Sequence, residues 1–457
     1  MYKEYFTKIQ EYFKSAPDAS TAVWNNTNYS LLIIYDEKLT DVSNFFNFHF
    51  ERFKKANPYK LYEEFPGLVK KIENTEIKTI CNHIYSGNLV IIIDESNGYY
   101  LSSESKPKRS LEVSQIDPTN LFTSQEGFIE DIRINMALVR KRIKRDDMIV
   151  KELKIGTNNQ NTIFIVYLKG NEEKAKEIEN KIIKENLTCA FSINTIGKIF
   201  QKKHLIPTVI YTGSPDNFCN AILDNRICVM LDNSPTQLIL PAPLSYFSSM
   251  KNEIDAPIYF NVISKTFLLL FFIITMFFLG LFVAIFNYNL NSLTITVISN
   301  VKISERGTTL SLFLEIVLVL IFFEFFRYVS SRSSTNYVQN IIIIIGGLLI
   351  GQNLMNAGII GSFTLLITAL CYLAAFAYTN NVYLITSISL FRLLIVIASY
   401  FGGLVGFFIA STITIVYFIS LKTFHTPYLY PFAPTYINKI KHFFTPREKR
   451  KDENHEN

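Results

Sequence analysis

The stretch TFLLLFFIITMFFLGLFVAIF, residues 266–286, contains no charged residue. A helix needs about 20 apolar residues to cross the roughly 30 Å hydrocarbon core of a bilayer, so this stretch predicts a membrane span. Further apolar runs follow at residues 310–326, 341–357, 363–378 and 384–421. The sequence therefore predicts a soluble N-terminal half joined to a C-terminal polytopic α-helical membrane domain, residues 261–421.

Charge differs between the two halves of the chain. Residues 1–260 carry 32 Lys plus Arg and 32 Asp plus Glu, whereas residues 261–457 carry 13 and 7 and account for the net charge of +6. Basic side chains cluster after the last apolar run, in a predicted basic tail over residues 422–457. Basic residues beside spans mark the cytosolic side, so we expect this tail in the cytosol and no nucleic-acid partner. The N-terminus lacks the apolar core of a secretory signal, which predicts a cytosolic N-terminal half.

The N-terminal half is expected to form two α/β subdomains, residues 1–120 and 121–260. Short branched apolar runs bounded by Asn, Asp or Gly predict strands. These runs are residues 29–35, 88–94, 162–168, 208–211, 227–231 and 237–240. Residues 44–56 predict a helix, and the polar residues 101–124 predict a linker. The alternation of strands and helices predicts a mostly parallel sheet covered by helices.

The second subdomain opens with QEGFIEDIRINMALVRKRI, residues 125–143. Apolar side chains recur every three or four positions and predict a helix with one buried face. They are Phe128, Ile132, Met136, Val139 and Ile143.

No enzymatic pattern is found in the sequence. It contains no phosphate-binding or dinucleotide-binding glycine loop and no Gly-x-Ser-x-Gly turn. Five cysteines form no Cys-x-x-Cys pair, and Cys81 with His83 supplies too few ligands for a metal site. We therefore expect a protein that is not an enzyme and that uses no metal or cofactor.

The third apolar run, together with the glycine that follows it, reads IIIIIGGLLIGQNLMNAG, residues 341–358. Gly347 and Gly351 are spaced for the close approach of a neighbouring helix. Gln352, Asn353 and Asn356 follow on the same helix, and amides in hydrocarbon need partners in protein or water. Either hydrogen bonds between helices or a hydrated path would supply those partners.

Ionisable residues occur inside the apolar runs. Glu324 and Arg327 are three positions apart and are expected to pair near a helix end. Glu315 and Arg392 each lie near the middle of their run, so we expect the two to form an intramembrane ion pair, because an isolated charge in hydrocarbon is costly.

The last apolar run, residues 384–421, is too long for one span. Gly402, Gly403 and Gly406 interrupt it, which favours a broken or re-entrant hairpin. Two passes would also return the basic tail to the cytosolic side.

Taken together, these motifs resemble one family, GerA, the A subunits of bacterial spore germinant receptors. Residues 125–143 resemble its REGF-ED-R-N-AL-RRRI helix, and residues 341–358 resemble its GGL-IGQ----AG span. SLKTFHTPYLYPFAP, residues 420–434, resembles its SLRSFG-PYLAPFAP segment, and the strand pair AILDNRICVMLD and PTQLILPAPL matches as well. The resemblance extends over residues 125–434.

The resemblance implies an A subunit in the spore inner membrane that works with a transporter-like B subunit and a lipoprotein C subunit. It also implies homo-oligomers that form or gate an ion path during germination. The residues that match family positions are Glu315, Glu324, Arg327, Gly346, Gly347, Gly351, Gln352 and Arg392.

The chain also departs from the family pattern. Leu320 and Tyr328 stand where the family tends to carry Glu, and Gly280 with the Asn-rich residues 287–307 replaces prolines. Two alternative functions stay open: the sporulation-operon paralogue that amplifies ion release without sensing nutrients, and a solute transporter.

Overall fold

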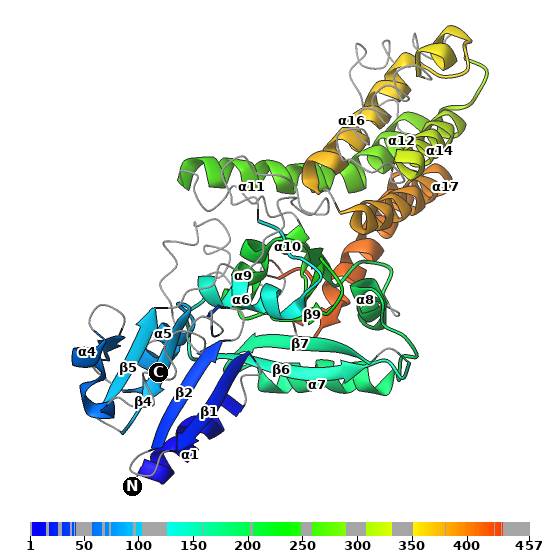
Figure 1. Cartoon of the computed structure of the whole chain (residues 1–457). Helices are drawn as coiled ribbons and strands as arrows, with labels where there is room; N and C mark the ends of the chain where they lie inside the picture. Colours follow the sequence, from blue (N-terminus) through cyan, green and yellow to red (C-terminus); the bar gives the residue numbers. More distant parts are fainter. Residues whose placement is uncertain are drawn as a thin grey trace. The chain divides into compact units, whose positions relative to one another are not determined.

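The structure, a computed structural model of the 457-residue chain, describes most of the chain. The described residues are 2–14, 18–25, 30–36, 39–40, 42, 57–65, 69–72, 75–94, 97–102, 126–158, 160–201, 204–247, 258–288, 308–330, 351–379, 381–424, 426–430 and 432. They divide into two compact units (Figure 1). Unit 1 comprises residues 1–203 and 209–241, and unit 2 comprises residues 204–208 and 242–457.

Unit 1 contains two five-stranded sheets. The strands of the first sheet are β1 (Ala19–Asn25), β2 (Ser30–Asp36), β3 (Val69–Lys71), β4 (Asn88–Ile92) and β5 (Gly98–Ser102). They lie in the order β1-β2-β4-β5-β3, and every neighbouring pair is antiparallel. The accompanying helices are α1 (Tyr2–Lys14), η1 (Pro58–Lys60), α4 (Leu61–Glu64) and α5 (Ile77–Ile84).

The second sheet has the same topology as the first. Its strands are β6 (Met148–Ile155), β7 (Asn161–Leu168), β8 (Ile210–Thr212), β9 (Ile227–Leu231) and β10 (Gln237–Leu240), in the order β6-β7-β9-β10-β8. Its helices are α6 (Ile132–Arg142), α7 (Glu172–Lys184), α8 (Ile193–Gln201) and α9 (Pro215–Leu223). Each sheet begins with a helix and a hairpin, sends its third strand to the far edge, and returns through a helix to the centre. Unit 1 is thus one architecture used twice.

The predicted parallel sheet is wrong, because all strand pairs in the second sheet are antiparallel. The sequence reading missed β6, which pairs with β7 along its whole length. The helical connection after β7 leads to the edge strand β8 and not to a neighbour of β7. A parallel pair requires a crossover between adjacent strands, and here the crossovers skip over the central strands.

The motif helix also starts later than expected. It begins at Ile132, because the side chain of Asp131 caps it by accepting hydrogen bonds from the backbone N–H groups of Arg133 (2.9 Å) and Ile134 (3.1 Å). The expected helix at residues 44–56 and nearly all of the expected linker at 101–124 lie outside the described residues.

Both faces of the first sheet are buried. On one face, Leu32 and Ile34 of β2 pack with Phe6 and Ile9 of α1 and Ile80 of α5. The opposite face of the same strand forms a separate core with β3, β4 and β5. Covering both faces removes the apolar strand from water, which is the dominant favourable term in folding.

Unit 2 is built from apolar helices. They are α10 (Leu244–Phe247), α11 (Ile258–Ile273), the π-helical turn η3 (Ile274–Phe278), α12 (Leu279–Tyr288), α14 (Leu312–Ser330), a helical segment at residues 351–356, α16 (Ser362–Tyr378) and α17 (Val382–Ser420). A short hairpin of β11 (Lys422–Thr423) and β12 (Thr426–Pro427) follows. Among the described helices, Val262–Asn287 and Val382–Ser420 are long and apolar enough to cross a bilayer.

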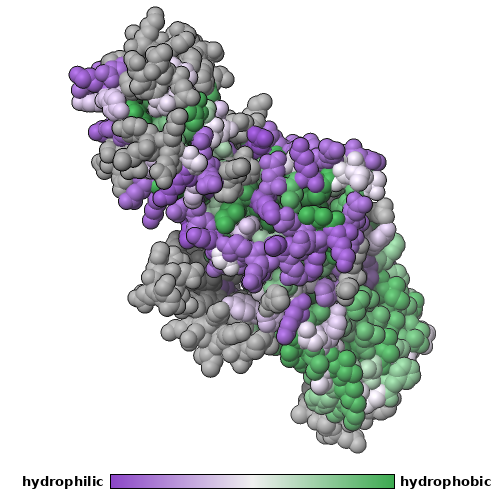
Figure 2. Space-filling model, turned by 90° about the horizontal axis from the view of Figure 1, so that it is seen from below, coloured by the Kyte–Doolittle hydropathy of each residue, from purple (hydrophilic) through white to green (hydrophobic). Residues whose placement is uncertain are grey.

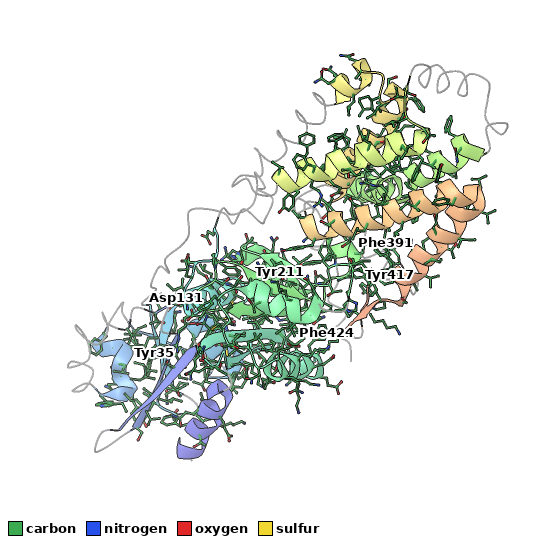
Figure 3. The ribbon with its side chains drawn as sticks, turned by 90° about the vertical axis from the view of Figure 1, so that its right-hand side faces the viewer. Tyr35, Asp131, Tyr211, Phe391, Tyr417 and Phe424 are labelled. Carbon is green, nitrogen blue, oxygen red and sulfur yellow. The ribbon has the colours of Figure 1, made fainter. Side chains whose placement is uncertain are left out.

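The predicted break in the last apolar run is confirmed. Within α17, Gly403 has φ 57° and ψ −141°, which is not helical. Phe391 and Tyr417 lie 26 positions apart in the sequence, yet their ring centroids are 5.4 Å apart (Figure 3). A straight helix would separate them by about 39 Å. α17 is therefore a hairpin with a first arm before Gly403 and a second arm after it.

Two glycines allow this hairpin to pack closely. A Cβ at Gly406 would overlap the carbonyl oxygen of Ala398, so the second arm turns directly against the end of the first. At Gly280 of α12, a Cβ would lie 2.5 Å from Cγ2 of Ile395 and 3.2 Å from Oγ of Ser399. The absence of side chains at these positions lets α12 and the two arms meet.

Candidate functional site

The C-terminal end of α14 carries an ion pair. Nη2 of Arg327 lies 2.5 Å from Oε2 of Glu324, and Nε of Arg327 donates to the same oxygen at 2.8 Å. The two residues are one helical turn apart, so their side chains meet on one face. The pairing expected from the sequence is confirmed.

Tyr372 of α16 contacts both the carboxylate of Glu324 and the backbone of α14. Its hydroxyl lies 3.0 Å from Oε1 of Glu324 and 3.2 Å from the carbonyl oxygen of Leu320, and it can donate its hydrogen to either. Tyr372 itself is buried in the apolar core of unit 2. The hydroxyl thus brings α16 and α14 together at a charged atom inside an apolar region.

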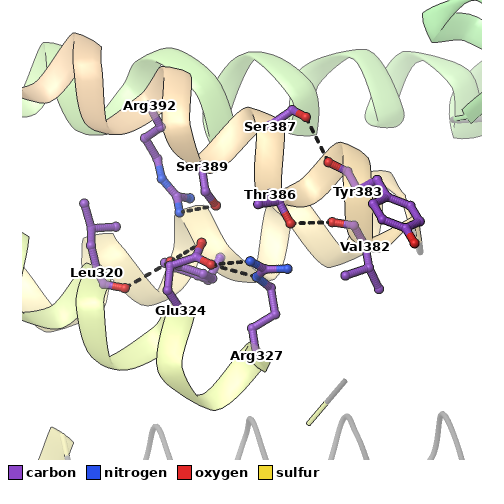
Figure 4. Close-up of polar contacts among 10 residues, drawn as sticks. Leu320, Glu324, Arg327, Val382, Tyr383, Thr386, Ser387, Ser389 and Arg392 are labelled. Carbon is purple, nitrogen blue, oxygen red and sulfur yellow. Dashed lines mark hydrogen bonds and ion pairs between the residues drawn. The ribbon is translucent and has the colours of Figure 1, made fainter. Parts of the chain in front are cut away.

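Arg392 of the first arm of α17 completes the site (Figure 4). Its side chain is 1% exposed, and its Cζ lies 4.2 Å from the centroid of the Tyr372 ring. Nη2 donates to Oγ of Ser389 at 3.2 Å, whereas Nε and Nη1 have no hydrogen-bond partner among the described residues. We call Glu324, Arg327, Tyr372 and Arg392 the charge cluster. It joins three helices through one acid, two cations and one aromatic ring.

The expected pair between Glu315 and Arg392 is wrong. Glu315 lies in the first turn of α14, where its Oε2 accepts a hydrogen bond from the backbone N–H of Gly361 at 3.1 Å. It is fully buried, and its Oε1 has no hydrogen-bond partner among the described residues. Nine positions separate it from Glu324, which is about 13.5 Å of helix. The position of a residue within its apolar run misled the prediction, because Glu315 lies at a helix start and not at its middle.

The glycine and amide positions of the third apolar run point in different directions. A Cβ at Gly351 would lie 2.7 Å from Cδ2 of Leu365, so Gly351 faces α16 closely. Gln352, Asn353 and Asn356 are exposed. Gly346 and Gly347 lie outside the described residues.

Sequence reasoning missed two features of the site. Tyr372 was hidden in an apolar run, and its only signal was a hydroxyl that needs a partner when it is buried. The π-helical turn η3 was also missed. It is held by Thr275, whose hydroxyl donates to the carbonyl oxygen of Cys371 at 3.4 Å, while the Cys371 thiol lies 3.8 Å from the carbonyl oxygen of Ile274. Such turns often occur at functional positions within helices.

Charged residues of the motif helix α6 serve the packing of unit 1. Arg140 is 1% exposed, its Nε lies 2.5 Å from Oδ2 of Asp18, and its Cζ lies 4.2 Å from the centroid of the Tyr85 ring. Beside it, burial raises the pKa of the Cys81 thiol to about 12 and outweighs the lowering effect of Arg140. These contacts tie the residue before β1 and the C-terminal end of α5 to α6, the helix that opens the second sheet.

The described residues contain no group of three or more His, Cys, Asp or Glu side chains that could hold a metal ion. The charge cluster offers hydrogen-bond donors and one carboxylate.

Comparisons with known proteins agree on one family. A sequence model described as Bacillus/Clostridium GerA spore germination protein matches residues 7–456. Spore germination protein XA of Bacillus anthracis is 26% identical over 393 residues, which cover 85% of this chain and 79% of that protein. Spore germination protein GerQA of Bacillus cereus is 25% identical over 440 residues, covering 93% and 87%.

Two further similarities complete the comparison. The uncharacterized membrane protein YfkQ of Bacillus subtilis (strain 168) is 25% identical over 380 residues, which cover 81% of this chain and 72% of that protein. Among solved structures, the N-terminal domain of the A subunit of the Bacillus megaterium spore germinant receptor GerK3 is 21% identical. It aligns with a TM-score of 0.39 and covers 52% of this chain and 94% of that domain.

Proposed function

Because the chain belongs to the Bacillus/Clostridium GerA family of spore germination proteins, we propose that it is the A subunit of a nutrient germinant receptor in the spore inner membrane. In this proposal unit 2 crosses the membrane several times and both termini are cytosolic. The subunit works with a transporter-like B subunit and a lipoprotein C subunit. Several copies assemble to form or gate an ion path.

The surface of unit 2 supports its placement in lipid. Large apolar side chains are exposed along α11, α14, α16 and both arms of α17. Figure 2 shows a contiguous apolar surface on one face of the molecule. Examples are Phe267, Leu314, Leu366, Leu394 and Ile413. Contiguous apolar surface of this kind is covered by lipid or by another protein in a stable protein.

The charge cluster is the observation that carries the proposed ion path. Arg392 is buried in an apolar unit without a carboxylate within ion-pair distance among the described residues. Charged groups at such positions are costly and mark ion pathways or moving elements. Glu324 already binds Arg327 on its own helix, and Tyr372 lies between Glu324 and Arg392. A small shift of α14 against α17 would change whether the Glu324 carboxylate pairs with Arg327 or with Arg392. Movement of the helices would then change the ion pairing inside the apolar unit.

The exposed amides support self-association. Gln352, Asn353 and Asn356 are exposed in the single chain. Within a bilayer each amide would need a hydrogen-bond partner. A ring of identical subunits meets this need, because every copy offers the same polar stripe to its neighbour or to a shared water-filled path.

The proposal is tested in spores that carry Arg392→Gln. We expect germinant-triggered cation release to be slowed or abolished while the amount of protein in the inner membrane is preserved, because the substitution removes a charge that lacks an ion-pair partner. The matched control is Leu394→Met on the same arm, whose side chain is 59% exposed, and it should release cations normally. Normal release from Arg392→Gln spores would contradict a role for the charge cluster in the ion path.

Self-association needs a separate measurement. Purified protein with Asn353→Cys should form disulfide- or crosslinker-joined oligomers of fixed size, and liposomes that contain it should show ion flux that changes with Asn356→Ala. A strictly monomeric protein whose flux is the same for all amide variants would leave a scaffold that only transmits the signal of its partners.

A further inference from the structure

The first long helix of unit 2 contains one turn with a different winding. α11 continues into α12 through η3, residues Ile274–Phe278, where the backbone is π-helical. A π turn holds one residue more than an α turn, so it acts as an insertion into an otherwise α-helical ladder. The winding of η3 therefore sets which side chains of α12 face the rest of unit 2.

The π turn is bonded to α16 by two long contacts. The hydroxyl of Thr275 donates to the carbonyl oxygen of Cys371 at 3.4 Å, and the Cys371 thiol lies 3.8 Å from the carbonyl oxygen of Ile274. Hydroxyl hydrogen bonds usually measure about 2.7–2.8 Å, and a thiol is a weak donor. These contacts hold the turn beside the residue that precedes Tyr372, and they are weak enough to break and form again.

Directly after the turn, α12 packs against the first arm of α17 through a glycine. A Cβ at Gly280 would lie 2.5 Å from Cγ2 of Ile395 and 3.2 Å from Oγ of Ser399. Real Cβ atoms essentially never show the first distance, so this contact requires a glycine at the facing position. Arg392 of the charge cluster lies three positions before Ile395, about 4.5 Å along the same arm. The glycine contact therefore determines where this part of the arm lies.

A change of η3 from π to α winding would replace the glycine at this contact. Taking the extra residue out of the turn rotates α12 by about 100° and shifts it by about 1.5 Å relative to α11. The preceding residue, Leu279, then takes the place of Gly280. Its side chain is far larger than the space at the glycine, so the first arm has to move away. Arg392 moves with that arm, whereas Tyr372 belongs to α16.

We propose that η3 is the switch of the ion path: its π winding holds the first arm of α17 in place, and its α winding moves Arg392 relative to Tyr372. Thr275 is a positioning residue, because its bond to α16 favours the π winding. The inference rests on the proposed function, in which the charge cluster controls the passage of ions. Two discrete windings suit a switch, because packed helices change between distinct arrangements and do not deform continuously.

The test uses the full-length protein in liposomes and two changes with opposite effects on the turn. Deletion of Phe278, which is 40% exposed, removes the extra residue from η3. Gly280 then keeps its place against α17, but the turn has no second winding. Gly280→Ala adds the Cβ that meets Ile395 and so disfavours the π winding. The two changes combined form the matched control, which keeps the clash and removes the ability to switch.

The winding is measured with a disulfide between Leu279→Cys and Ser399→Cys. Mass spectrometry locates the bridge and distinguishes it from bridges to the native cysteines. We expect few bridges when the turn is unchanged, a severalfold rise when Gly280→Ala is added, and none when Phe278 is also deleted. A bridged fraction that does not respond to Gly280→Ala, or that persists after the deletion, would overturn the switch.

The positioning role of Thr275 is measured with the same bridge. Thr275→Val removes the hydroxyl bond to α16 and should raise the bridged fraction. Thr386→Val is the control, because its hydroxyl also bonds a backbone carbonyl, that of Val382 at 2.7 Å, but within α17 alone. An equal effect of the two substitutions would refute the positioning role.

Potassium efflux from the same liposomes connects the switch to the ion path. We expect Gly280→Ala to raise efflux severalfold and deletion of Phe278 to remove that increase. Efflux that stays high after the deletion would indicate damaged packing and overturn the switch. Equal efflux from all variants, with the expected bridges, would overturn the control of ions by η3. The absence of efflux from every variant would instead contradict the ion path of the proposed function, while the bridges would still report the change of winding.

Discussion

Tyr372 should contribute to stability through two separable contacts. Tyr372→Phe keeps the ring beneath Arg392 and removes the hydroxyl that lies 3.0 Å from Oε1 of Glu324. A hydrogen bond to a charged group contributes about 1.5–3 kcal/mol. Glu324 is partly exposed, with 32% of its side chain accessible, so we expect a loss near the lower end of that range.

Tyr372→Leu should cost more, because it also removes the ring. The contact between a desolvated guanidinium and an aromatic ring contributes about 2 kcal/mol. Replacing one apolar side chain with another of similar volume adds about 1 kcal/mol of repacking cost. The step from the phenylalanine variant to the leucine variant is therefore expected to be about 3 kcal/mol.

The same step measured in an Arg392→Met background isolates the cation–π contact. Without the guanidinium only the repacking cost remains, so the step should shrink to about 1 kcal/mol. Arg392→Met alone should be close to neutral, because it removes two buried donors without partners along with the favourable contacts.

The assay is the apparent melting temperature of purified full-length protein in one detergent, read as the fraction that stays monodisperse after heating. The wild type should have the highest melting temperature, the Tyr372→Phe variant a lower one and the Tyr372→Leu variant the lowest. A step from phenylalanine to leucine that is equal in both backgrounds would refute the reasoning, since it would show that Arg392 draws no stability from the ring.

The remaining predictions concern backbone, thiols and unit 1. Gly403→Ala should lower the melting temperature, because its positive φ is strained for other residues at a cost of about 1–3 kcal/mol, whereas Gly402→Ala should be neutral, because no atom lies within 4 Å of its added Cβ. Of the described cysteines only Cys189 is not buried, so native protein should react with one equivalent of a thiol reagent, and reaction of the buried thiols before unfolding would count against the packing. Arg140→Met should destabilise unit 1 by about 3–5 kcal/mol, because it leaves the buried Asp18 carboxylate without its cation. An unchanged melting temperature would show that the ion pair is dispensable. Residues 1–255 expressed alone should be soluble with one cooperative melt, and persistent aggregation would contradict the predicted domain boundary.

Some local features of the fold could be read from the sequence, although β1, β3, β5 and β6 were not predicted. β9 and β10 occupy the residues predicted for them, and β4 begins at the predicted Asn88. The break in the last apolar run was also predictable, because a helix of 39 residues with adjacent glycines exceeds the thickness of a bilayer and contains residues that tolerate non-helical backbone. Each of these features depends on a short stretch of chain and its own chemistry.

The order of the strands could not be predicted in the same way. The alternation of helices and strands suggested parallel neighbours, but the crossovers lead to the sheet edges. β6 was missed because its exposed charged side chains, such as Lys151 and Glu152, weaken the apolar signal. Strand order depends on which distant strand meets the free edge, and nothing in a local pattern encodes that choice.

The charge cluster shows the same division most clearly. By itself, the sequence determined that this chain has an apolar C-terminal half with a few ionisable residues, because hydropathy and charge are properties of the residues themselves. It also determined the pair of Glu324 with Arg327, because one helical turn brings them together. Only the tertiary structure decided that Arg392 meets the ring of Tyr372 and that Glu315 binds a backbone N–H instead. The physical reason is that a buried charge takes whichever partner the packing of separate helices brings within a few ångströms, and that packing is set by contacts spread over the whole unit.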